Sequence, residues 1–454
     1  MIPKLNPEQM LAPVVAQYCA SLQQAGFQGE IETSYAARLA VATDNSVYQA
    51  LPQAVLLPKH QQDVELITRL ATEPRFMQLK FAPRGGGTGT NGQALTEHLV
   101  VDLSRHMRTI LDFDPVKRQV RVQAGVIKDQ LNAYLAPFGY FFAPDLSTSN
   151  RATIGGMINT DASGQGSLVY GKTSDHVLAL TTVLADGTVL KTASQPIAEA
   201  EAKAALDTAE GHIYRQVLAS CRQFRPQILA KFPRLNRFLT GYDLEHVFNP
   251  DLTEFDLGRV ITGSEGSLGF VTEALLNVTP IARHKCLVNV KYNSFESALR
   301  NAPFLVAAEA TSVETVDSKV LDLARGDIIW HQVKDLITDV PGSDMQGLNM
   351  VEYNSEDQTE IEQKIASLTA RLDNAVASKT DGIIGYQLTY DNAAISNIYA
   401  MRKKAVGLLG NTKGRQKPLA FAEDTAVPPE NLADFIMEFR ALLDSHGLQY
   451  GMFG

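Results

Sequence analysis

The chain has 454 residues, of which 45% are hydrophobic and 20% charged, and its formal net charge is −9. This length predicts two or three domains, and the composition is typical of a water-soluble globular protein. The net negative charge argues against nucleic-acid binding, which would need a local basic patch. No apolar run approaches the roughly 20 residues of a membrane span, and no signal peptide precedes the first polar stretch. The sequence therefore indicates a cytoplasmic protein without a membrane span.

Cysteine and histidine usage argues against a metal site within the chain. Cys19, Cys221 and Cys286 are widely spaced and form no Cys-x-x-Cys pair, which excludes an iron–sulfur cluster held by this chain alone and suits a reducing compartment. The nine histidines form no metal-binding grouping, and only His176 lies beside a motif of interest. We therefore predict no metal ligands here.

The first 280 residues predict a mixture of short strands and helices. Residues 1–45 are expected to form one or two amphipathic helices before the main domain begins at about residue 46. Further helices are predicted at 61–72 and 129–135, strands at 54–58, 79–83, 99–103 and 120–125, and a hairpin over 177–190 with its turn at Asp186-Gly187. Because these strands form meanders rather than regular strand–helix repeats, the fold class predicted is α+β.

The pattern changes around Pro280, which predicts a second α+β domain over 281–454. Its predicted strands are 287–292, 348–353 and 383–389, and its predicted helices are 295–306, 361–372, 398–409 and a last one from Pro428-Pro429 to Gly447. Residues 448–454 then begin a new apolar strand. Because natural termini more often end in polar residues, we expect the chain to be truncated within this domain.

The strongest local signal is the glycine-rich run from Pro83 to Gln93. A loop with so many glycines can turn several backbone N–H groups toward one anion. Gly87, Gly89 and Gly92 match a Rossmann fingerprint by letter, but too few residues follow for a crossover helix. A second false match, the P-loop pattern from Gly166 to Thr173, lies in loop sequence and precedes a hairpin rather than a helix. The sequence therefore argues against both nucleotide-binding motifs.

Three motifs taken together resemble the FAD-linked oxidase family, whose flavin fold is shared by vanillyl-alcohol oxidase and para-cresol methylhydroxylase. They are the Arg84–Gln93 loop, the segment Asp145–Thr160 with its continuation to His176, and the segment Gly263–Glu273. Residues 402–407 and 421–428 further resemble the large bacterial D-2-hydroxyglutarate dehydrogenases, in which a flavin half is fused to an iron–sulfur half. The resemblance implies an FAD-binding PCMH-type domain of two subdomains over 46–280, followed by a cap domain for the substrate.

The resemblance implies FAD as the cofactor, with any 4Fe-4S cluster in sequence beyond this chain. FAD should be noncovalent, because neither histidine nor cysteine occurs between Arg84 and Gln93. The residues expected to bind it are Pro83, Arg84, Gly85, Gly86, Gly87, Thr88, Gly89, Thr90, Asn91, Pro144, Asp145, Ser149, Thr153, Gly155, Gly156, Asn159, Ala162, Ser163, Gly164, Tyr170, Gly263, Glu265, Gly266, Gly269 and Val271.

On the substrate side, the resemblance places Arg402 where a cap arginine grips the substrate carboxylate. A planar guanidinium suits a carboxylate because it can donate two parallel hydrogen bonds. The sequence departs from smaller relatives at Val406 and Ala422, where a threonine and a lysine are usual. Lys413, Arg415 or Lys417 could supply the missing cation, and Glu423 and Asp424 could be pocket residues or helix-entry acids.

The function expected is oxidation of a D-2-hydroxy acid, with 2-hydroxyglutarate ahead of D-lactate and glycolate, and with electrons passed to an iron–sulfur region or partner. In relatives the strand at 448–454 leads into a segment with catalytic and metal-ligand histidines, and that segment is expected beyond Gly454. Two alternatives stay open, an oxidase that reduces oxygen and an FAD-binding subunit without turnover of its own. The sequence is compatible with a homo-oligomer but fixes neither the oligomeric state nor the electron acceptor.

Overall fold

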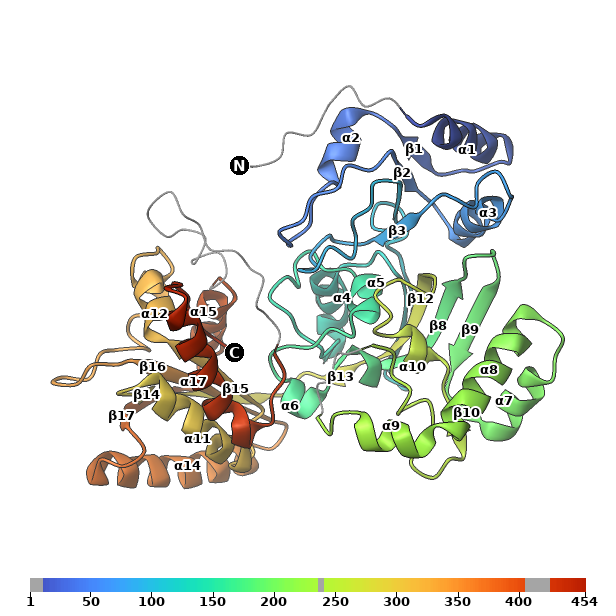
Figure 1. The fold of residues 1–454 in the computed structure, drawn as a ribbon. Coiled ribbons are helices and arrows are strands. Elements are labelled where there is room, and N and C mark those ends of the chain that lie inside the picture. The colour runs from blue at the N-terminus through green and yellow to red at the C-terminus, as the bar shows by residue number, and fades with distance from the viewer. Residues whose placement is uncertain (1–10, 236–240, 405–424) are drawn as a thin grey trace. The chain divides into compact units, whose positions relative to one another are not determined.

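The computed structural model describes residues 11–235, 241–404 and 425–454, which divide into two compact units (Figure 1). The first unit comprises the described residues up to Ser163, those from Lys172 to Arg234 and those from 241 to Pro280, and the second comprises Gly164–Gly171, Leu235 and the described residues from Ile281 onward. The segment Gly164–Gly171 is therefore an excursion whose contacts lie with the second unit. Among the described residues, no helix combines the length and apolar character needed to cross a membrane.

The first unit begins with a small sheet in the order β1-β2-β4-β3. Its strands are β1 (Glu30–Glu32), β2 (Ala54–Leu57), β3 (Phe81–Arg84) and β4 (Leu99–Asp102), and its helices are α1 (Pro13–Gln24), α2 (Tyr35–Ala40) and α3 (Gln61–Ala71). β4 pairs in parallel with both β2 and β3, and the connection from β3 to β4 is the glycine-rich loop rather than a helix. The buried faces of α1 and α3 share one hydrophobic cluster with this sheet.

A larger antiparallel sheet follows in the order β5-β6-β12-β8-β9. Its strands are β5 (Ile110–Asp114), β6 (Gln119–Gln123), β8 (Val177–Val183), β9 (Val189–Ala193) and β12 (Phe270–Asn277). Around it lie α4 (Lys128–Leu135), η1 (Ala136–Phe138), α5 (Ile154–Asn159), η2 (Thr173–Asp175), α7 (Ile197–Ala204), α8 (Ala209–Gln223), α9 (Arg225–Lys231), α10 (Gly258–Ile261) and the two-stranded pairs β7 (Tyr140–Phe141) with β13 (Thr279–Pro280) and β10 (Gln195–Pro196) with β11 (Glu254–Phe255). The alternating apolar residues of β6 and β12 share one core with the buried faces of α4, α5 and α8.

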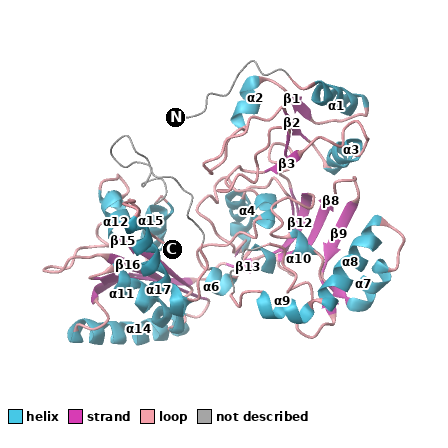
Figure 2. Ribbon diagram, in the orientation of Figure 1, coloured by secondary structure: helices cyan, strands magenta, loops and turns pink. Residues whose placement is uncertain are grey.

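The second unit is built on a four-stranded antiparallel sheet in the order β15-β16-β14-β17, with helices on both faces (Figure 2). Its strands are β14 (His284–Tyr292), β15 (Ser312–Asp317), β16 (Gly347–Ser355) and β17 (Ile383–Thr389). Its helices are α6 (Ser167–Tyr170), α11 (Phe295–Ala307), α12 (Ser318–Arg325), α13 (Trp330–Val333), α14 (Gln358–Ser378), α15 (Asn392–Lys403) and α17 (Pro429–Ser445). One core lies under α11 and α14, and the other lies under α12, α13 and α15.

The structure confirms the α+β class and most of the elements expected from periodicity. The hairpin predicted at 177–190 is real but longer, because β9 runs on to Ala193. The one or two helices expected within residues 1–45 are α1 and α2, and a short strand, β1, lies between them. At the other end, Phe453 forms an isolated bridge with Val316 on the edge of β15.

Core packing of the second unit yields a prediction at Leu372, which is fully buried in α14. Leu372→Ala should cost about 2–5 kcal/mol in the free energy of unfolding, because the lost methyl groups leave a cavity. Chemical denaturation followed by fluorescence measures this change. Leu442→Ala is the control, because Leu442 is 56% exposed on α17 and its truncation should cost far less. Equal effects of the two changes would contradict the assigned core.

Candidate functional site

The glycine-rich loop after β3 packs directly against the loop that leads into α5. A Cβ added at Gly85 would overlap the side chain of Thr153, and one added at Gly86 would overlap the backbone carbonyl of Arg151. Neither position can carry a side chain unless the loops separate. The first two sequence motifs therefore form one surface, and Thr153 helps to shape it by capping α5 through Gly156 N–H at 3.3 Å.

The third motif, which leads into β12, is hydrogen-bonded to the second motif and packs against the first. The Asn159 carbonyl accepts from Glu265 N–H at 2.7 Å, and its side-chain Oδ1 accepts from Gly266 N–H at 3.1 Å. Glu265 and Gly266 both have positive φ, and a Cβ at Gly266 would overlap the ring of Pro83. The three motifs, far apart in sequence, therefore meet in space as the resemblance implies.

The backbone of the first loop is arranged to receive an anion. Asn45 donates its N–H to the Gly89 carbonyl at 3.2 Å and its Nδ2 to the Thr88 carbonyl at 3.3 Å. Among the described residues, no acceptor is present for the N–H groups from Gly85 to Thr90. Unpaired donors on a glycine loop are what a diphosphate requires, so these residues fit the FAD expected from the sequence.

A basic residue in such a loop would suggest a contact with phosphate, but the side chain of Arg84 forms other contacts. Its Nη1 and Nη2 donate to the carbonyls of Val41 and Thr43 at 3.2 and 2.9 Å. Burial lowers the pKa of its guanidinium, and this effect outweighs the negative charges of Asp102 and Asp44, which act to raise it. A Cβ at Gly87 would collide with this guanidinium. Arg84 thus ties the loop to the N-terminal segment, and its contact with FAD stays a prediction.

Two buried lysines anchor the second motif. Lys128 at the start of α4 donates to Asp145 Oδ1 at 2.7 Å. Lys172 donates to Asp161 Oδ2 at 2.5 Å, and Ser174 bonds the same carboxylate through both its N–H and its hydroxyl. Lys172 is only 4% exposed, so the lysine of the false P-loop match is a structural ion-pair partner. Loss of one member would leave the other charged and buried, which is costly.

The remaining predicted cofactor residues are divided between the two units. Pro144 and Ser149 are buried, and Ser149 accepts through its carbonyl from Asp129 N–H at 3.1 Å. Gly269 is needed where the chain passes the carbonyl of Val183 in β8, and Val271 is buried in the core. Ala162 and Ser163 belong to the first unit, whereas Gly164 and Tyr170 lie in the excursion that belongs with the second. The contacts with FAD stay predictions for the residues named above and for Thr90, Asn91, Gly155 and Gly263.

Arg402, the predicted substrate arginine, lies in the last turn of α15 in the second unit. Its Nε donates to Glu314 Oε2 on β15 at 2.7 Å, and its guanidinium lies 4.5 Å from the ring centroid of Phe453. Both charged side chains are largely buried, at 18% and 12% exposure. Glu352, on the adjacent strand, accepts from Gln165 of the excursion at 2.8 Å. Arg402 is therefore ordered and partly shielded, rather than a freely solvated arginine.

The other residues considered on the substrate side cannot be placed. Val406, Lys413, Arg415, Lys417, Ala422, Glu423 and Asp424 all lie outside the described residues. Among the described residues, no group of three or more histidine, cysteine, aspartate or glutamate side chains could hold a metal ion. His176 is buried and packs edge-on against Phe142 at 5.8 Å between ring centroids, so its surroundings are those of a core histidine.

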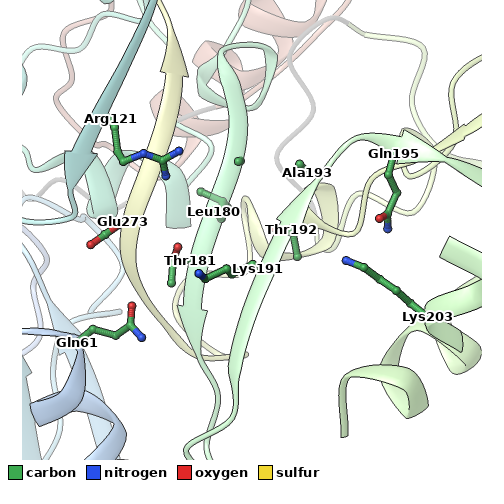
Figure 3. A pocket seen from close by; sticks show the side chains of 11 residues that line it. Gln61, Arg121, Leu180, Thr181, Lys191, Thr192, Ala193, Gln195, Lys203 and Glu273 are labelled. Carbon is green, nitrogen blue, oxygen red and sulfur yellow. The ribbon is translucent and has the colours of Figure 1, made fainter. Parts of the chain in front are cut away.

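A separate hollow of about 500 Å³ lies on the five-stranded sheet of the first unit (Figure 3). Arg121, Thr181, Lys191 and Glu273 line it from neighbouring strands, and Lys203 approaches from α7. None of the predicted cofactor residues lines this hollow, so it is distinct from the surface formed by the three motifs.

Sequence reasoning missed the residues that hold the motifs in place. Asn45, Lys128 and Glu314 contact motif residues or Arg402 from elsewhere in the chain, with Glu314 88 positions from its arginine, and Lys172 binds Asp161 within the second motif. The only local signal was for Lys172, which falls in the false P-loop match.

The contact between the first two motifs predicts that Gly86→Ala weakens FAD binding by about tenfold or more. One added carbon must displace the Arg151 carbonyl and separate the loops, and overpacking of this kind costs about 1–3 kcal/mol. Titration of the FAD-free protein with FAD measures the change. Gly326→Ala is the control, because a Cβ there would meet nothing closer than the Leu323 carbonyl at 3.5 Å. Unchanged affinity in Gly86→Ala would refute the assigned contact.

Because FAD is expected to bind without a covalent bond, we predict that the flavin leaves with the supernatant when the protein is precipitated with acid. Cys19, Cys221 and Cys286 are all buried and form no disulfide, and neither histidine nor cysteine occurs in the first loop. Absorbance of the supernatant and of the redissolved pellet measures the partition. Flavin that stays in the pellet would indicate a covalent bond and contradict this expectation.

Comparison with known proteins agrees with the geometry. Residues 52–193 match a family of FAD binding domains, and residues 281–454 match the C-terminal domain of FAD linked oxidases. The chain is 60% identical over its whole length to proteins named D-2-hydroxyglutarate dehydrogenase from Escherichia coli (strain K12) and Pantoea ananatis (strain AJ13355). It covers 45% and 44% of those proteins, so it spans less than half the length of the relatives it matches.

Solved structures agree on the fold. An alkyldihydroxyacetonephosphate synthase superposes with a TM-score of 0.61 at 16% identity, over 90% of this chain and 68% of that one. Such low identity supports the architecture alone. The two matched domains and the 60% identity over the whole chain, together with the three motifs that meet around the glycine loop, show that the chain belongs to the family of FAD-linked oxidases.

Proposed function

We propose that this chain is the flavin-binding and substrate-cap part of an FAD-dependent dehydrogenase that oxidises a D-2-hydroxy acid to the 2-oxo acid. The observation that carries the proposal is that each unit, taken by itself, offers groups suited to one of the two reactants. The first unit offers unpaired backbone donors on a glycine loop, and the second offers an ordered arginine suited to a carboxylate. D-2-hydroxyglutarate is the favoured substrate, because the relatives at 60% identity carry that name.

The division of roles follows from the residues. The N–H groups from Gly85 to Thr90 would hold the diphosphate, with the loop supported by Thr153, Asn159 and Glu265. When bound, FAD supplies an acceptor for the hydride that leaves C2 of the substrate. Arg402 would bind the substrate carboxylate and thereby orient C2, while a base takes the hydroxyl proton. The two electrons would then pass to an iron–sulfur region or another acceptor.

Two features of the surroundings bear on this proposal. Glu314 places a buried carboxylate against Arg402, so a dicarboxylate substrate would need a further cation. Lys413, Arg415 and Lys417 are candidates by sequence and lie outside the described residues. The cytoplasm is the proposed setting, because three free cysteines suit a reducing compartment.

Arg402→Ala should lower kcat/KM for the 2-hydroxy acid about ten- to a hundredfold, since a charge-assisted hydrogen bond to a carboxylate contributes about 1.5–3 kcal/mol. FAD content should not change, because no predicted cofactor contact involves Arg402. The measurement is dye-coupled turnover of the gene product that contains residues 1–454, with D-2-hydroxyglutarate, D-lactate and glycolate compared.

Arg283→Ala is the matched control, because that arginine is 79% exposed in the same unit and also pairs with a glutamate. Kinetics of Arg402→Ala that match those of Arg283→Ala would remove Arg402 from the substrate site. Absence of turnover by the unmutated protein with every acid would instead favour an FAD-binding subunit without its own activity. Rapid reoxidation of the reduced flavin by air would favour an oxidase.

A further inference from the structure

The Nε–H of Arg402 is already committed before any substrate arrives. It donates to Glu314 Oε2 at 2.7 Å, with both side chains mostly buried. Among the described residues, no hydrogen-bond acceptor is present for Nη1 or Nη2 of Arg402. A guanidinium has two edges that can receive a carboxylate in bidentate fashion, and the one that includes Nε is taken by Glu314. The edge formed by Nη1 and Nη2 is the one left for a ligand.

A second contact fixes the plane of the same guanidinium. The ring of Phe453 lies against it at 4.5 Å, within the range of a cation–π interaction. Phe453 is itself held against β15, because Thr315 and Gly454 exchange backbone hydrogen bonds of 2.6 and 3.0 Å. One strand therefore sets both contacts, since β15 carries Glu314 and binds the segment that carries Phe453.

We propose that Glu314 is a positioning residue for the substrate, acting through Arg402. Its carboxylate holds the guanidinium by Nε so that Nη1 and Nη2 face the substrate carboxylate in one orientation. The inference rests on the proposed function of Arg402 and adds a residue to it. Its physical basis is preorganisation: an arginine side chain ordered in advance loses less conformational freedom when the ligand binds.

The charge of Glu314 determines the direction in which its replacement should change substrate binding. A carboxylate 2.7 Å from Nε stabilises the arginine but also competes for it with an anionic substrate. Removing the charge while keeping an acceptor should strengthen substrate binding. Removing the acceptor as well should leave the guanidinium charged but misoriented. This change should lower kcat more than it weakens substrate binding.

The test compares Glu314→Gln with Glu314→Ala in the gene product that contains residues 1–454, with FAD content checked for each. Glu314→Gln should lower KM and keep kcat near that of the unmutated protein, because the glutamine oxygen can still accept from Nε. Glu314→Ala should lower kcat about ten- to a hundredfold without raising KM. In an Arg402→Ala background, Glu314→Ala should have no further effect on kcat/KM, because its action passes through the arginine.

Glu356→Ala is the control, because Glu356 Oε2 also meets an arginine Nε, that of Arg283 at 3.4 Å, but on the exposed surface. It should change neither constant. A raised KM with unchanged kcat in Glu314→Ala, or a full additional loss in the double variant, would overturn the proposal. Should Glu314→Ala fail to fold, a raised KM in Glu314→Gln would overturn it alone.

A readout without turnover separates this inference from the proposed function. The Nε–H signal of Arg402, assigned by its disappearance in Arg402→Lys, should shift in the ¹⁵N–¹H spectrum of Glu314→Gln and weaken in Glu314→Ala. An Nε–H signal insensitive to both changes would refute the positioning role whatever the substrate. Lack of flavin reduction by any 2-hydroxy acid, with the spectral shifts present, would refute the proposed function only.

Discussion

The close approach of two backbone segments is the constraint on which the first unit depends. Gly85 and Gly86 lie so near Thr153 and Arg151 that a side chain at either glycine would force the segments apart. Their absence of Cβ atoms therefore serves packing between loops as well as access for a cofactor. Asn45 holds the loop by donating to the carbonyls of Thr88 and Gly89, while the loop's N–H groups find no acceptor in the part of the chain that the structure describes.

Buried ion pairs stabilise the second motif. Lys128 and Lys172 each neutralise an aspartate of the second motif, and Lys172 shares Asp161 with Ser174. Asp161 has a positive φ, an unfavourable conformation for a non-glycine residue that its three hydrogen bonds offset. The chain leaves the first unit three residues later, at Gly164, and returns at Lys172. The ion pair therefore closes the base of the excursion that carries Gln165 and Tyr170.

Different parts of the molecule were predictable from sequence to different degrees. Strands such as β4 and β6 and helices such as α3 carry strong periodicity, and their positions were predicted within a few residues. β15 and α12 were missed, although β15 carries Glu314, because a strand such as Ser312–Asp317 with buried polar residues lacks simple alternation. The three glycine motifs were recognisable because glycine is required wherever backbones approach closely. Their supporting partners were not, because ion pairs such as Arg402 with Glu314 depend on distant segments that sequence alone does not bring together.

The central proposal is that hydride leaves C2 of a 2-hydroxy acid while the carboxylate is held by a preorganised arginine. Anaerobic stopped-flow reduction of the flavin with D-2-hydroxyglutarate, unlabelled and deuterated at C2, tests it most directly in the gene product that contains residues 1–454. We expect that the flavin is reduced and that deuteration slows the reduction. A flavin that dithionite reduces but no 2-hydroxy acid does, or a reduction rate insensitive to deuterium at C2 under conditions where chemistry limits the rate, would contradict it.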